Sequence, residues 1–179
     1  LMECEQVYNN LGLREPQIDV LTEAGNNAQR QNNPTQRATV ALRLSSYYEQ
    51  ISNYPSAVEQ AEQGLKLATE SNNHELMLES ELRLAQGLRS LGGYDASRQR
   101  LQDLLAKTQV SQTSKLESQC LIDLAISFWF LGDLEQMALC SEQALAVATR
   151  EEDLGRQISA LTNLGIAASE TSRYSLARE

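Results

Sequence analysis

Hydrophobic residues return along this chain with the spacing of one helix face. Leu84, Leu88 and Leu91 stand four and then three residues apart, and residues 124–131 repeat that spacing. Residues separated by three or four positions lie on one side of an α-helix, so both segments are predicted to be amphipathic helices. A short break with two glycines, residues 92–95, follows the first of them. Glycine takes a left-handed cap conformation at little cost, so this break predicts a helix end.

The pattern recurs with a fixed period of 40 residues. Leu44, Leu84, Leu124 and Leu164 occupy equivalent positions, and a weaker copy begins around Cys4. A constant period means that each unit has the same structure and stacks on its neighbour, because one helical hairpin cannot bury its apolar face alone.

The period predicts an all-α fold of alternating helices, each of about 14 to 17 residues. We expect first helices at 36–51, 76–91, 115–131 and 155–171, second helices at 55–70, 95–108, 134–149 and from 174 onward, and a partial pair at 2–11 and 16–31. We expect one repeat domain over residues 1–179, divided into a partial unit 1–35, units 36–74, 75–114 and 115–154, and a truncated unit 155–179. The start at Leu rather than Met leads us to expect a fragment of a longer protein.

Composition narrows the classes of partner. The 179 residues are 41% hydrophobic and 22% charged, as in globular proteins, and the net charge is −9. An acidic surface repels nucleic-acid phosphates, and no cluster of Lys and Arg is longer than a pair, so we expect no nucleic-acid partner. No apolar run approaches the ~20 residues that span a bilayer, so we expect no membrane partner. The three cysteines have no CxxC spacing and favour a reducing cytoplasm, where we expect them to be buried or half-buried small hydrophobes.

The sequence holds no recognisable catalytic or metal-binding pattern. His74 is the only histidine, and it lies in a polar segment between two predicted helices. The chain has no phosphate-binding glycine loop, no dinucleotide-binding glycine motif and no HExxH zinc motif. We therefore expect no enzyme activity, no catalytic residue, no metal site and no cofactor.

The repeated residues resemble the tetratricopeptide repeat (TPR). The resemblance rests on Leu-Ala at 84–85 and 124–125, on Leu-Gly at 164–165, and on glycine at the turns. The usual repeat has ~34 residues. These longer units are similar to those of bacterial transcription regulators, signalling ATPases and cyclases, and of animal adaptors that bind peptides in an extended groove. The resemblance implies a right-handed α-solenoid of antiparallel helix pairs, with the first helices lining a concave groove.

The resemblance also implies which residues face that groove. They are Arg43, Arg83, Asp123 and Asn163, which precede the repeated leucine, then Ser46, Gln86, Ile126 and Ile166, two residues after it, and Arg89, Trp129 and Phe130, a turn later. Two stacked arginines could hold carboxylates of a partner, and the aromatic residues could receive an apolar anchor. In the alternative interpretation Arg43 pairs with Glu49 or neighbouring acids, and at least one of Trp129 and Phe130 belongs to the core.

These expectations combine into one function and one alternative. The sequence favours a non-catalytic scaffold that binds a protein or peptide, as the sensing or docking module of a larger bacterial regulatory protein. The alternative is a self-assembly module in which chains stack through their end repeats.

Overall fold

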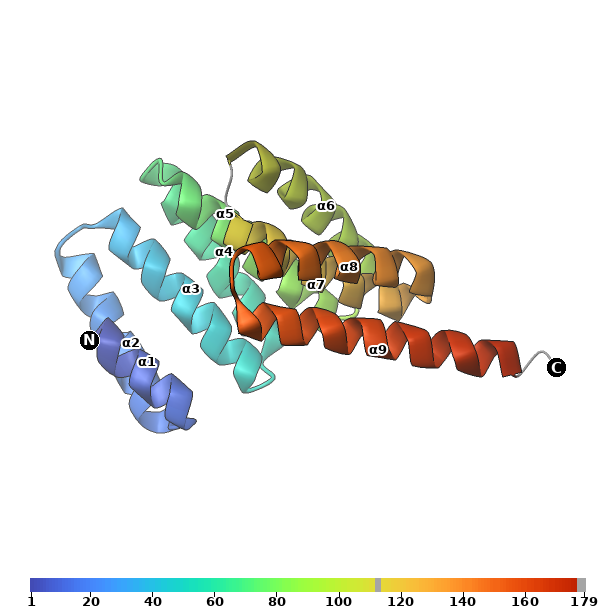
Figure 1. The fold of residues 1–179 in the computed structure, drawn as a ribbon. Coiled ribbons are helices and arrows are strands. Elements are labelled where there is room, and N and C mark those ends of the chain that lie inside the picture. Colours follow the sequence, from blue (N-terminus) through green and yellow to red (C-terminus); the bar gives the residue numbers. More distant parts are fainter. Residues whose placement is uncertain (112–113, 177–179) are drawn as a thin grey trace. The chain divides into compact units, whose positions relative to one another are not determined.

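The computed structural model is helical throughout the part that it describes, the backbone of residues 1–111 and 114–176 with the side chains of residues 1–108 and 116–172. In this part the helices are α1 (Met2–Leu11), α2 (Arg14–Arg30), α3 (Pro34–Gln50), α4 (Tyr54–Glu70), α5 (His74–Ser90), α6 (Tyr94–Ser111), α7 (Ser114–Leu131), α8 (Leu134–Arg150) and α9 (Leu154–Leu176), and they are labelled in Figure 1.

The chain divides into two compact units, Leu1–Leu91 and Gly92–Glu179. In the first unit each of the helices α1 to α5 packs on the next one along the chain, and α3 also packs on α5. In the second unit α6, α7, α8 and α9 pack in the same sequential way, and α7 also packs on α9. Contacts between sequential and alternate helices are those of stacked antiparallel helix pairs.

The helices follow one another in steps of 20 residues. Gly12, Gly92 and Gly132 have left-handed backbone conformations, with φ of 69°, 84° and 79°. The same conformation occurs at Asn32, Ser52, Asn72 and Glu152, with φ between 49° and 59°. These residues are separated by multiples of 20 positions. Each 40-residue period therefore consists of two steps of one helix and one turn, and each described turn has a residue with left-handed conformation at the same place. Glycine is common there because a Cβ is disfavoured at positive φ.

The residue after the left-handed position ends one helix and begins the next. The backbone N–H of Asn73 donates to the carbonyl of Ala68, while the carbonyl of Asn73 accepts from Met77 in the following helix. The Asn73 side chain accepts the N–H of Leu76 at 3.1 Å, which caps α5. Asn33, Asn53, Asp133 and Asp153 cap their helices in the same way. A connection of only two or three residues therefore provides hydrogen-bond partners for groups at both helix ends.

The structure confirms the all-α fold and most of the predicted helices, with shifts of a few residues at their ends. The predicted break near residue 172 is wrong, because α9 is continuous from Leu154 to Leu176. The turn position there is Ser172 and the capping position is Arg173, a residue type that offers no acceptor to a helix N-terminus. The rest of the second helix predicted from 174 onward lies at 177–179, outside the described residues.

Small residues fill the cores of both units. Ala38, Ala61, Ala85 and Ala125 are fully buried, and Leu21 and Leu104 are among the largest buried side chains. Within the described ranges, no helix combines the length and apolar character needed to cross a membrane.

Candidate functional site

The two arginines predicted for the groove already contact carboxylates of their own unit. Arg43, on α3, donates to the Gln6 side chain at 2.9 Å and lies 3.9 Å from the Glu5 carboxylate. Arg83, on α5, lies 3.9 Å from Glu49. Both arginines therefore have intramolecular partners. The alternative interpretation held this for Arg43 alone, although Glu49 pairs with Arg83 rather than with Arg43.

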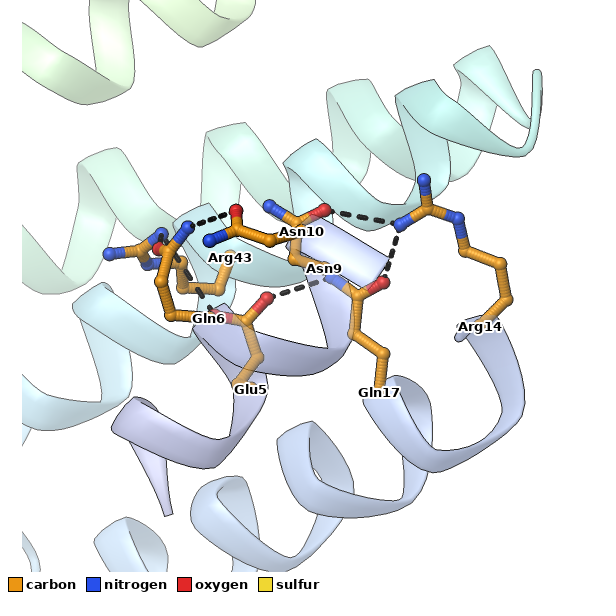
Figure 2. A network of polar contacts seen from close by, with 7 residues as sticks. All are labelled: Glu5, Gln6, Asn9, Asn10, Arg14, Gln17 and Arg43. Carbon is orange, nitrogen blue, oxygen red and sulfur yellow. Dashed lines mark hydrogen bonds and ion pairs between the residues drawn. The ribbon is translucent and has the colours of Figure 1, made fainter. Parts of the chain in front are cut away.

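Arg43 belongs to a polar network that joins α1, α2 and α3 (Figure 2). Glu5 is only 1% exposed, and its Oε1 accepts a hydrogen bond of 2.7 Å from Gln17. Arg14 donates to the Gln17 side chain at 2.7 Å and to Asn9 at 3.1 Å, and the Gln6 amide donates to Asn10 at 3.0 Å. A buried carboxylate needs such partners, so the network fixes α1 on the following helices.

Sequence reasoning missed Glu5 and Gln17, although the fixed period aligns them with a pair of positions one repeat later. Their positions one period later are Ser45 and Ala57, and the Ser45 hydroxyl donates to the Ala57 carbonyl at 2.8 Å. The same pair of positions is thus in contact in both hairpins. A long acidic and a long amide side chain replace two small residues in the first of them.

The other predicted residues of the first unit are buried or half-buried. Gln86 is buried and accepts a hydrogen bond of 3.2 Å from Arg83. Ser46, on α3, and Arg89, on α5, are half-buried.

In the second unit, all six predicted groove residues lie on the contacting helices α7 and α9, and four of them are buried or half-buried. Asp123 is 2% exposed and accepts a hydrogen bond of 3.1 Å from Gln119. Asn163, one period later, is 7% exposed, and its amide nitrogen has no hydrogen-bond partner. Ile126, which packs on the cluster of Leu121 and neighbouring residues, and Ile166 are half-buried.

Three aromatic side chains gather where α6 begins and α7 ends, and we call Tyr94, Trp129 and Phe130 the aromatic patch. The rings of Tyr94 and Phe130 stack with centroids 4.5 Å apart and planes 4° apart, and Trp129 lies 4.9 Å from Phe130. Trp129 is 40% exposed and Phe130 is 46% exposed. The expectation that one of these two belongs to the core is therefore wrong. They lie in the last turn of α7, where Phe130 stacks on Tyr94 and the Trp129 ring lies at 50° to the Phe130 ring.

Titratable and nucleophilic groups form no reactive centre among the described side chains. His74 is exposed at the start of α5, and the described residues contain no cluster of three potential metal ligands. Burial, reinforced by the charges of Asp123 and Glu117, raises the pKa of the Cys120 thiol to about 12. Burial, with the charge of Asp133, raises the pKa of Cys140 to about 11. Cys4 is exposed, contrary to the expectation that every cysteine is at least half-buried.

The fold is that of an all-α helical repeat solenoid of the TPR-like type. Among solved structures, RapI in its apo form matches 97% of this chain with a TM-score of 0.79 and 13% identity. A Rap protein in complex with competence and sporulation factor matches with a TM-score of 0.84 and 14% identity. The nearly identical TPR-like repeats of a putative kinesin light chain from P. anserina match with a TM-score of 0.73 and 17% identity over 98% of this chain.

These likenesses concern the fold, and the chain covers only part of some of the proteins that it resembles. It spans 63% of the RapI chain, 48% of the Rap protein in the complex, and 87% of the kinesin light chain repeats. No protein-family model and no curated protein matches the chain in sequence.

Proposed function

We propose that this chain is a non-catalytic scaffold that binds a protein or peptide, and that the aromatic patch anchors the partner. The exposure of Trp129 and Phe130 carries the proposal. Aromatic side chains are enriched in the centres of protein interfaces, because they bury large areas at low cost in conformational entropy. The stacked Tyr94 holds Phe130 in one orientation, which reduces the entropy lost on binding.

Helices α7 and α9 supply the polar part of the proposed site. The Asn163 amide nitrogen is buried and lacks a hydrogen-bond partner, so it would need a side-chain rotation to donate to a carbonyl of a bound chain. Ile126 and Ile166 lie three residues after Asp123 and Asn163 and offer apolar contacts beside them. The Rap protein solved with competence and sporulation factor supports a peptide as one class of partner.

In the first unit, the proposed contribution to binding comes from Arg43, Ser46, Arg83, Gln86 and Arg89. A partner carboxylate would exchange with Glu5 or Glu49, which now lie 3.9 Å from the two guanidinium groups. The finer proposal is that the chain is the sensing or docking module of a larger bacterial regulatory protein.

The single tryptophan makes the proposal directly testable. Proteins or displayed peptides selected on the full chain would be titrated while the fluorescence of Trp129 is recorded. We expect a shift of the emission as the indole is covered, and a loss of affinity of about tenfold or more for Phe130→Ala, which keeps the reporter.

Leu11→Ala is the matched control, because Leu11 is 66% exposed on α1 and lies outside the aromatic patch. It should bind as the unchanged chain does. Ligands that bind Phe130→Ala with full affinity and leave Trp129 emission unchanged would contradict the patch as the anchor. The contribution of the first unit is tested separately, by measuring the affinity of the same ligands for the variants Arg43→Glu and Arg83→Glu.

A further inference from the structure

Helix α9 carries an apolar stripe that no other helix covers in the part of the chain that the structure describes. Leu154 is 71% exposed, Ile158 is 65% exposed and Leu161 is 54% exposed. Gly165 and Ala168 continue the stripe, and both are exposed. At 100° per residue these five positions fall within about 80° around the helix. We call Leu154, Ile158, Leu161, Gly165 and Ala168 the α9 stripe.

Equivalent faces in other helices are buried under an antiparallel helix. Three periods before Ile158 and Gly165 stand Ala38 and Ser45 of α3. Ala38 is fully buried and packs on Leu67 of α4, and Ser45 hydrogen-bonds to the α4 backbone.

The second unit shows the same arrangement one period before Leu161. Leu121 of α7 is 3% exposed and packs in one cluster with Ala144 and Val147 of α8. The α9 stripe is therefore the face that takes an antiparallel helix in this fold. The opposite face of α9 already has its neighbours, because Ala160 and Ala167 are buried.

The stripe is complementary to itself when two copies of α9 run antiparallel. A twofold axis at Leu161 places each Leu154 opposite Ala168 of the partner subunit, and each Ile158 close to Gly165 of the partner subunit. Large side chains thus meet small ones on both sides of the axis, and the two copies of Leu161 face one another at the axis. A Cβ on Gly165 would meet nothing within 4 Å, so the space beside this residue is open to an incoming side chain.

Charge also permits two identical stripes to meet. The charged residues between 154 and 172 are Arg156 and Glu170, and both lie about 160° from the centre of the stripe. Thr162, at the edge of the stripe, donates its hydroxyl to the Ile158 carbonyl at 2.8 Å. Neither like charges nor this hydroxyl oppose burial of the surface.

We propose that the α9 stripe is a docking surface for a second copy of this chain, which forms a twofold dimer through an antiparallel α9 pair centred on Leu161. The dimer uses a surface separate from the aromatic patch, and it does not depend on the proposed binding function.

Oligomeric state across a dilution series tests the proposal. Sedimentation equilibrium of the full chain should give a mass near twice 19.9 kDa at high concentration, falling to one chain on dilution. Leu161→Glu should stay monomeric at concentrations at least tenfold above the midpoint, with unchanged helical circular dichroism. Leu11→Glu, which alters a residue that is 66% exposed on α1, is the control and should dimerise normally.

Cysteine pairs test the register. In a Cys4→Ser background, Leu161→Cys should form a covalent dimer on mild oxidation, because the two residues face one another across the axis. Leu154→Cys alone should not, because the two copies of residue 154 would be about 21 Å apart, beyond disulfide reach. Leu154→Cys combined with Ala168→Cys should restore the crosslink.

Two results would overturn the proposal. One is a monomer at every concentration, which would assign the stripe to a helix from another protein or from a further segment. The other is a dimer that persists in Leu161→Glu and whose crosslinks do not follow the antiparallel register.

Discussion

Single residues set how closely neighbouring helices approach one another in the first unit. Gly87 of α5 is buried against α4, and a Cβ built on it would lie 2.6 Å from Cγ2 of Val58. Gly64 of α4 faces Leu42 and Ser80 with a Cβ position 3.2 Å and 3.4 Å from their nearest atoms. Since valine has few rotamers, α5 cannot accept a methyl group at Gly87 without a shift of α4.

Gly87→Ala is therefore expected to destabilise the chain. Overpacking costs about 1 to 3 kcal/mol, and the better helix propensity of alanine offsets about 1 kcal/mol of it. The free energy of unfolding, measured with denaturant, should fall, and the double variant with Val58→Ala should recover part of the loss.

Gly25→Ala in α2 is the matched control for this substitution. Its Cβ would lie 3.6 Å from Val40, an ordinary contact, so propensity alone should stabilise the chain by about 0.5 to 1 kcal/mol. Equal effects of the two substitutions would show that the close approach to Val58 does not limit the packing.

The sequence could predict which positions are repeated, but not how individual side chains use them. Glu5 stands at a position that is serine, alanine or glycine in later repeats, and only the structure shows its bond to Gln17. Trp129 and Phe130 have large apolar side chains, which are typical of core residues. Their exposure depends on the end of α7, where Phe130 stacks on Tyr94 from another helix and Trp129 lies against Phe130.

The helix with its following turn is the element that the chain repeats. The left-handed residue recurs every 20 positions in the described turns, and different residue types fill it. Glycine is favoured there, asparagine is tolerated, and a glutamate with φ of 55° at residue 152 is strained.

Introducing glycine at one of these turns and removing it at another should shift the free energy of unfolding in opposite directions. Glu152→Gly is expected to stabilise the chain by up to about 1 kcal/mol, because the Cβ penalty is removed. Gly132→Ala should destabilise it by about 1 kcal/mol through backbone strain alone, because its Cβ would meet nothing within 4 Å. Thermal unfolding of both variants would measure the two shifts, and a gain for Gly132→Ala would refute the account.

The same element explains where the helix prediction succeeded and where it failed. Asn53, Asn73 and Asp133 accept hydrogen bonds from the helices that they start, so a break at each was predictable from residue type. The period alone predicted a break near residue 172. The period is insufficient to predict a helix break where the capping position holds a residue type that cannot cap, and α9 therefore continues to Leu176.

At the scale of the whole chain, the fold class could be predicted from the sequence because a fixed period admits one stacked structure. The division at Leu91 could not, because the repeat continues across that position in the sequence. The units also differ in chemistry. Both buried thiols, Cys120 and Cys140, belong to the second unit, while the exposed Cys4 belongs to the first.

This difference predicts that alkaline pH weakens the second unit. Folding raises the thiol pKa from 9.0 to about 12 at Cys120 and to about 11 at Cys140. The unfolded thiols ionise first, so stability is intact below pH 9 and falls as the pH rises toward the folded pKa values. The loss at pH 10 is roughly 1 kcal/mol for each thiol.

Denaturant unfolding followed by Trp129 fluorescence, at pH 8 and pH 10, would measure this loss. The double variant Cys120→Ala with Cys140→Ala is the control and should show a smaller dependence on pH. An unchanged pH dependence would contradict the thiols as its source.

The 20-residue step limits how the length of such a chain can change. A duplication of 40 residues inside either unit would add a complete hairpin, and each existing helix would keep its direction. A duplication of 20 residues would reverse the direction of every later helix and exchange inward and outward faces. Changes in length that preserve packing therefore come in multiples of two steps.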